Sequence, residues 1–126
     1  MSETNPLRVL LVDDNDLAAE LLAEFVGIVR HQVHVAGTAT EGLALAAEHA
    51  PQVAIVDIIL PDMDGYQLAK RLRAQSGGSL LILALSGLPR NADHADDAVF
   101  DGWLEKPVDL AALESRLQQA AAERAS

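Results

Sequence analysis

The segment LRVLLVDDND (residues 7–16) decides the fold, because a nearly continuous apolar run passes directly into carboxylates. The segments VAIVD (53–57) and LLILALS (80–86) repeat this pattern of an apolar run that ends in a polar residue. Continuous apolar runs are typical of parallel strands that are covered on both faces. The sequence therefore predicts buried strands over 7–12, 53–56 and 80–85.

Two shorter strands and a first helix extend this pattern. VHVA (33–36) and GWLE (102–105) are the shorter strands. Asp16 is predicted to start a helix as its N-cap. Apolar residues at spacings of four, four and three then predict one face of that helix, and they are Leu17, Leu21, Phe25 and Ile28.

Further helices are predicted from their ends. Thr38 and Glu41 have the spacing of a capping box at the start of one helix. Another spans about 65–75 and stops before two glycines, and the last begins after Asp109, a natural N-cap. The segment 91–100 is short, acidic and poorly amphipathic, so it gives only a weak prediction of a helix.

Strand–helix alternation with short loops predicts an α/β domain, a doubly wound five-stranded parallel sheet of five βα units. The 126 residues suit a single domain, 1–126. We expect its core over about 7–118 and frayed ends at 1–6 and 122–126.

The charge balance excludes several kinds of partner. The chain has 19 acidic against 9 basic residues and a net charge of −10, so it offers no basic stripe for nucleic acid. It has no cysteine for a disulfide or a thiolate metal site. The polar start MSETNPLR indicates neither a signal peptide nor a membrane span. We therefore expect a cytoplasmic protein with no direct nucleic-acid contact and no membrane insertion.

Polar residues end four of the five predicted strands. In a parallel sheet all the carboxyl ends meet at one edge, where ligands bind. We therefore expect this edge to gather three carboxylates, a hydroxyl and an ammonium group, from Asp13, Asp14, Asp57, Ser86 and Lys106.

This set of groups indicates phosphoryl-transfer chemistry. Crowded carboxylates need a cation, and all-oxygen ligands favour Mg2+, with Mn2+ as a possible substitute. The four histidines are dispersed, which argues against zinc. The metal and the lysine would neutralise phosphoryl oxygens while one carboxylate acts as nucleophile.

At this point the sequence resembles the bacterial response-regulator receiver domains of two-component systems and phosphorelays. LLVDDND, VDIILPDMDGYQLAKRL, ALSG and DGWLEKPVD stand in the order and spacing of that family's motifs, over about residues 7–118. The resemblance implies a flavodoxin-like sheet with strand order 2-1-3-4-5. It also implies a phosphoprotein that takes its phosphoryl group from a histidine kinase or a histidine phosphotransfer protein, rather than a dedicated enzyme. The motifs show a mild similarity to receivers attached to hybrid sensor histidine kinases.

The resemblance also implies residue roles. Asp57 would be the phosphoacceptor and would hold Mg2+ with Asp14 and, largely through water, Asp13. The main-chain carbonyl of Ile59 would complete the protein ligands. Ser86 and Lys106 would contact the phosphoryl oxygens. Trp103 would change its rotamer together with Ser86 on phosphorylation. This switch would change the surface beside the fourth and fifth strands.

Three positions depart from the family pattern. Ile59 and Leu88 are aliphatic where relatives often have polar groups that position water, so we expect slow self-dephosphorylation. Val99-Phe100 lacks the usual glycine before the fifth strand. This change falls on the weakly predicted fourth helix, which in the family often carries output or dimer contacts. A standard dimer face is therefore not carried over, and the oligomeric state stays open between a monomer and a weak dimer.

Two alternative functions remain. Haloacid-dehalogenase-like phosphatases also combine an Asp nucleophile, Mg2+, a hydroxyl and a Lys, and DND (14–16) resembles their acidic motif. A pseudo-receiver that binds partners without phosphate is the second alternative, although every motif residue is present. Asp62 and Asp64 are interpreted as turn formers.

Overall fold

The computed structural model describes residues 6–28, 31–76, 80–87, 100–106 and 108–125. Its strands confirm all five predicted segments, with end points that differ by one residue at most: β1 (Arg8–Val12), β2 (Gln32–Ala36), β3 (Val53–Asp57), β4 (Leu81–Ser86) and β5 (Gly102–Glu105). The helices within the described ranges are α1 (Asp16–Ile28), α2 (Ala39–His49), α3 (Gly65–Ser76) and α4 (Leu110–Ala125). Leu88 and the weakly predicted helix, apart from Phe100, lie outside the described residues.

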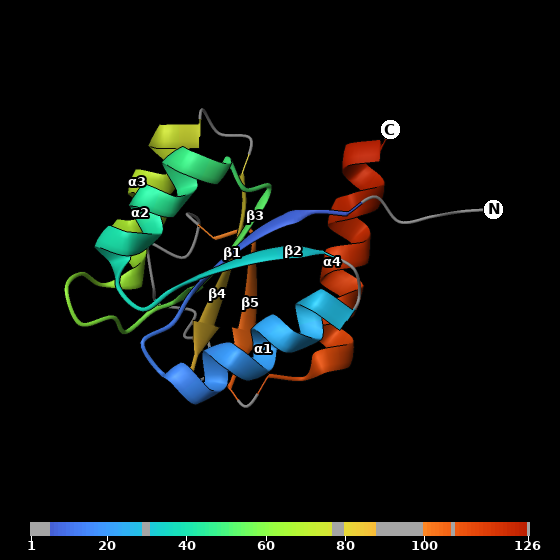
Figure 1. Cartoon of the computed structure of the whole chain (residues 1–126), viewed down its shortest axis with the longest axis horizontal. Coiled ribbons are helices and arrows are strands. Elements are labelled where there is room, and N and C mark those ends of the chain that lie inside the picture. Colours follow the sequence, from blue (N-terminus) through green and yellow to red (C-terminus); the bar gives the residue numbers. More distant parts are fainter. Residues whose placement is uncertain (1–5, 29–30, 77–79, 88–99, 107, 126) are drawn as a thin grey trace.

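The five strands form one parallel sheet in the order β2-β1-β3-β4-β5. Helices α2 and α3 cover one face, and α1 and α4 cover the other (Figure 1). This is the doubly wound arrangement that the continuous apolar strands predict, since each strand must be buried on both sides.

The core is divided by the sheet into two clusters. Along β1, Val9 and Leu11 pack with residues of α1 and α4. Leu10 and Val12 point the other way and pack with residues of α2 and α3. Alternate residues of a strand face opposite sides of the sheet, so one short run supplies both clusters.

The predicted apolar face of α1 is only partly the face that packs on the sheet: Phe25 is partly buried against the core, whereas the other three residues are not. Leu17, Leu21 and Ile28 are 80%, 61% and 70% exposed. The buried residues are instead Ala19, Leu22 and Val26. The helix has two adjacent apolar stripes, and the one with the small Ala19 allows the backbone to approach the sheet. Leu17, Leu21 and Ile28 of the other stripe are left facing outward.

Most predicted helix ends are confirmed, with one shift. At α1 the capping side chain belongs to Asn15, whose Oδ1 accepts from Ala18 N–H at 3.1 Å, so Asp16 is the first helical residue rather than the N-cap. At α2, Thr38 Oγ1 accepts from Glu41 N–H at 3.1 Å. The Glu41 carboxylate accepts from Gly37 N–H at 2.8 Å rather than from the cap residue itself.

The last helix is longer than predicted. Asp109 Oδ1 accepts from Ala111 N–H at 3.0 Å, which confirms the N-cap. The helix then continues to Ala125 through most of the segment expected to fray. Ala120 and Ala121 are buried, because they extend the stripe formed by earlier leucines on the same side. No helix of the described residues is long and apolar enough to cross a membrane.

His31 holds the start of β1 from the end of the α1–β2 connection. Its ring is buried, and its Nδ1 accepts a hydrogen bond from Leu7 N–H at 3.0 Å. Burial lowers the pKa of His31 below its ordinary value of 6.5. A neutral ring is required here, because a protonated Nδ1 has no lone pair to accept the bond.

We expect His31 to make the domain less stable in mild acid. The unfolded chain binds a proton at His31 near pH 6.5, whereas the folded state does so only at lower pH, so stability falls as pH drops through this interval. Chemical denaturation between pH 8 and pH 5 should show this loss of unfolding free energy. The share of the loss that comes from His31 should be absent in His31→Leu. That variant should itself cost about 1–3 kcal/mol at pH 8, because Leu7 N–H loses its buried acceptor. An unchanged pH slope in His31→Leu would contradict the assignment.

Candidate phosphoryl-transfer site

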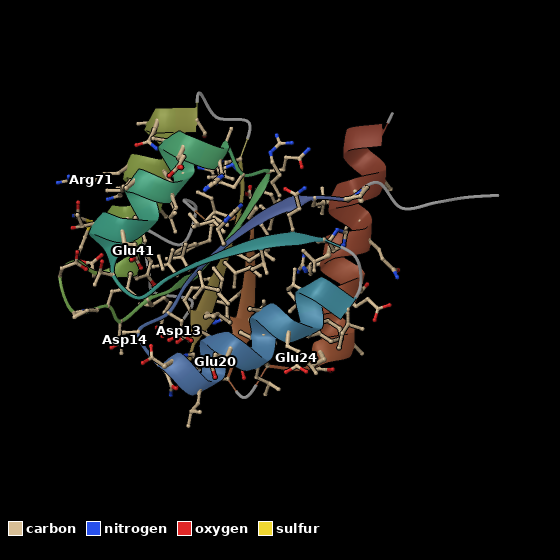
Figure 2. All side chains as sticks on the ribbon, in the orientation of Figure 1. Asp13, Asp14, Glu20, Glu24, Glu41 and Arg71 are labelled. Atoms are coloured by element: carbon tan, nitrogen blue, oxygen red, sulfur yellow. The ribbon has the colours of Figure 1, made fainter. Side chains whose placement is uncertain are left out.

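The carboxyl ends of the strands bring the predicted polar residues together. Asp13 follows β1 and is anchored by its N–H, which donates to Ala36 O at 3.0 Å. Asp57 and Ser86 are the last residues of β3 and β4, and Lys106 follows β5. Asp13, Asp57 and Ser86 are all buried. Figure 2 shows Asp13 and Asp14 at this edge, beside the start of α1.

Lys106 is the cation that faces the buried carboxylates. Its Nζ lies 2.6 Å from Asp57 Oδ2 and 3.4 Å from Asp13 Oδ2. Burial lowers the pKa of Lys106, but its hydrogen bond and ion pairs with Asp57 and Asp13 outweigh this, so the pKa is raised. The side chain of Lys106 keeps 29% of its surface exposed, so its ion pairs with the acids are only partly shielded from solvent.

The Oδ2 atom of Asp13 has the Lys106 ammonium 3.4 Å away but is otherwise poorly partnered for a buried carboxylate oxygen. Asn15 N–H donates to its Oδ1 at 3.0 Å, but Oδ2 is buried and accepts no hydrogen bond from the described residues. Burial raises the pKa of Asp13 above its ordinary value, and the nearby Asp57 raises it further, against the opposing effects of Asn15 N–H and Lys106. A second cation would stabilise this oxygen.

The acids are placed to supply that cation site. One carboxylate oxygen from each of Asp13, Asp14 and Asp57 lies within 4.8 Å of the others, with Asp14 exposed and the other two buried. All the donors are oxygens, as a hard divalent ion requires, and the exposed side leaves room for its waters. Within the described ranges this metal-capable group contains no histidine, in agreement with the sequence.

The loop after Asp57 is folded tightly against it. Ile59 N–H donates to Asp57 Oδ1 at 2.9 Å, while the Ile59 side chain is 70% exposed. Gly65, at the start of α3, passes so close that an added Cβ would lie 2.6 Å from Asp57 O. Sequence reasoning missed this role of Gly65; its place as the last residue of the PDMDG turn was the available signal.

The two acids of this loop are helix caps. Asp64 Oδ1 accepts from Gln67 N–H at 2.8 Å in the first turn of α3. Asp62 reaches α2 instead, where it accepts from Ala39 N–H at 2.9 Å, Thr40 N–H at 3.0 Å and Thr40 Oγ1–H at 2.7 Å. The Thr40 hydroxyl and these amides lower the pKa of Asp62 to about 2. Asp62 therefore ties the loop after Asp57 to a second helix, a contact that the sequence did not predict.

The predicted switch residue lies on the strand next to Ser86. Trp103 pairs with Ala84 in the β4–β5 register, two positions before the pair Ser86 and Glu105. The indole Nε1 is buried. The structure thus places Trp103 beside β4, whereas a change of rotamer remains a prediction.

Comparisons with known proteins agree with this arrangement. Residues 9–118 match the family model of the response regulator receiver domain. The virulence sensor protein BvgS of Bordetella bronchiseptica is 36% identical over 127 residues, which cover 94% of this chain and 10% of that protein. The regulatory protein VanRB of Enterococcus faecalis is 30% identical over 112 residues, 89% of this chain and 51% of VanRB.

A solved structure shows the same fold over the whole domain. The response regulator receiver domain protein (CheY-like) from Methanospirillum hungatei JF-1 superposes with a TM-score of 0.86 at 26% identity, covering 94% of this chain and 96% of that one. The curated relatives are longer, since the chain spans about half of VanRB and a tenth of BvgS. With the family model matched over residues 9–118, this chain belongs to the response regulator receiver domain family.

Proposed function

We propose that Asp57 accepts a phosphoryl group from a phosphohistidine, with Mg2+ held by Asp13, Asp14, Asp57 and the main-chain carbonyl of Ile59. The observation that carries this proposal is the contact of the Asp57 carboxylate with Lys106, at 2.6 Å, within the three-carboxylate cluster. In this function the domain acts in the cytoplasm and receives its phosphoryl group from a histidine kinase or a histidine phosphotransfer protein.

The chain's own groups fit an in-line transfer. A carboxylate oxygen of Asp57 would form the new O–P bond as the P–N bond of phosphohistidine breaks, and the imidazole leaves with the bonding electrons. Lys106 and the Ser86 hydroxyl would bind the oxygens of the transferred group. Bound Mg2+ would supply further positive charge at these oxygens. Ile59 N–H would hold the other Asp57 oxygen and so orient the nucleophile.

Intact-mass measurement after incubation with acetyl phosphate and Mg2+ tests this function. We expect one phosphoryl adduct on the wild-type chain and none when EDTA removes the metal. Absence of an adduct with acetyl phosphate and also with a histidine-phosphorylated donor would overturn the proposal. A phosphatase would instead turn over a phosphate ester, and this activity would be lost in Asp14→Asn but kept in Asp57→Asn.

An apolar surface next to the site suits a docking donor. Leu17 and Leu21 are exposed in the first two turns of α1, which begins beside Asp13 and Asp14 (Figure 2). A groove of about 220 Å3 continues from Leu21 to Lys106, lined by Asp13, Ala18, Leu21, Leu22, Lys106, Val108 and Leu110. Contiguous exposed apolar residues mark protein interaction sites. We propose that the donor helix that carries the phosphohistidine lies here.

We expect Leu21→Ala to slow transfer from a histidine-phosphorylated phosphotransfer domain by about tenfold, as loss of a central interface contact does. Phosphorylation by acetyl phosphate should not change, because this small donor needs no docking surface. Ile28→Ala is the matched control, since Ile28 is similarly exposed on the same helix but lies two turns farther from the site. Equal rates for Leu21→Ala and wild type with the protein donor would exclude this face.

The Ile59 side chain is expected to slow loss of the phosphoryl group. It is exposed next to Asp57 and offers no group that orients an attacking water. We expect Ile59→Asn to shorten the phosphoryl lifetime by roughly tenfold, about 1.4 kcal/mol in barrier. The decay of the intact-mass adduct after removal of acetyl phosphate measures it, with Ile59→Val as control. A wild-type lifetime of seconds would contradict slow self-dephosphorylation.

A further inference from the structure

Three of the chain's four aromatic residues (Phe, Tyr and Trp) lie in one row. The rings of Tyr66 and Phe100 meet edge to face with centroids 5.2 Å apart. Those of Phe100 and Trp103 also meet edge to face, with centroids 6.0 Å apart and planes at 90°. Phe100 is the central member and is only 8% exposed.

The row of rings runs from the start of α3, next to Asp57, to β5, the strand at the edge of the sheet. Tyr66 is the second residue of α3 and follows Gly65, which packs against the backbone of Asp57. At the other end, Trp103 lies on β5. Phe100, the residue just before Asp101, contacts both of these rings.

The position of Phe100 is fixed from the β4 side. Asp101 N–H donates to Ile82 O at 2.7 Å, and Asp101 Oδ2 accepts from Ile82 N–H at 2.8 Å. The same Oδ2 accepts from Arg73 Nη2 at 2.9 Å. The residue directly after Phe100 is therefore held to β4 by two hydrogen bonds.

Edge-to-face contacts depend on direction, and close-packed interiors transmit displacements rather than absorb them. We propose that Phe100 is a positioning residue that couples the first turn of α3 to the side-chain orientation of Trp103. A shift of the Asp57–Gly65 contact on phosphorylation then reaches β5 through Tyr66, Phe100 and Trp103. This inference rests on the proposed function only for the phosphorylation that drives the shift.

Trp103 is the sole tryptophan, so its fluorescence reports on the row directly. In the unphosphorylated protein, Tyr66→Leu should change acrylamide quenching of Trp103, and the same substitution should have no effect when Phe100→Leu is already present. This double-mutant cycle isolates coupling through Phe100. Phe25→Leu, the aromatic residue outside the row, is the control. Equal effects of Tyr66→Leu in both backgrounds would overturn the coupling.

Phosphorylation tests the same row under the proposed function. With the adduct verified by intact mass, quenching should change by about twofold in the wild type and in Phe25→Leu. Phe100→Leu and Tyr66→Leu should accept the phosphoryl group fully but lose at least about half of this change. A full quenching change in phosphorylated Phe100→Leu, or none in phosphorylated wild type, would refute the inference. Failure to form any adduct would refute the proposed function instead, and the unphosphorylated cycle would still decide the coupling.

Discussion

Asp57→Asn should abolish the phosphoryl adduct, a loss of at least about 100-fold in the rate of acceptance. The substitution keeps the size of the side chain but replaces the anionic oxygen with an amide, which is a poor nucleophile toward phosphorus. The contact that orients it can persist, because the amide oxygen can still accept from Ile59 N–H, now 2.9 Å from Asp57 Oδ1. The effect should therefore fall on chemistry rather than on the fold. Intact mass after acetyl phosphate and Mg2+ measures it.

Asp64→Asn is the matched control for this result. Asp64 is an exposed carboxylate of the same loop and caps α3, so its loss should leave the adduct intact. An equal adduct on wild type and on Asp57→Asn would show that another residue of the cluster accepts the phosphoryl group. Peptide mapping of the borohydride-reduced adduct would then identify the residue that carries it.

The candidate site could be predicted because it depends on strand ends. A run such as VAIVD fixes a parallel strand, and the residue that follows it must lie at the carboxyl edge of the sheet. Asp13, Asp57, Ser86 and Lys106 all meet this condition, so topology alone brings them together. Their contacts, such as the ion pair of Lys106 with both acids, follow from that common edge.

Features that depend on which surfaces meet could not be predicted in this way. Periodicity identified α1 but selected the stripe with Leu17 and Leu21, which are exposed. Hydrophobic spacing alone does not show which of two apolar stripes packs on the sheet, because the small Ala19 decides how closely the helix can approach it. The contact of Asp62 with the amino end of α2 joins residues 22 and 23 positions apart, with no local pattern to mark it. The cap at Asn15 differs from the predicted Asp16 by one residue, since both side chains are good caps.

Lys106→Gln should have the second largest effect, on both stability and phosphorylation. Without the ammonium group, Asp13 and Asp57, whose side chains are 0% and 8% exposed, would face each other with no charged partner from the described residues. Removing one member of a buried ion pair costs 3–5 kcal/mol in typical cases, and the partial exposure of Lys106 reduces this to about 2–3 kcal/mol. Urea denaturation in EDTA measures this loss, and Mg2+ should recover part of it by mass action.

The same variant should accept phosphoryl roughly 100-fold more slowly, because it lacks a charge that stabilises the transition-state oxygens. Lys70→Gln is the control, since Lys70 is the only other lysine and lies on the exposed side of α3. Stability has its own internal control: Lys106→Gln should cost much less when Asp57→Asn is already present, because one of the two facing charges is gone. If Lys106→Gln costs the same in both backgrounds, the lysine stabilises the fold by packing, and its charge is not what holds the acidic cluster together.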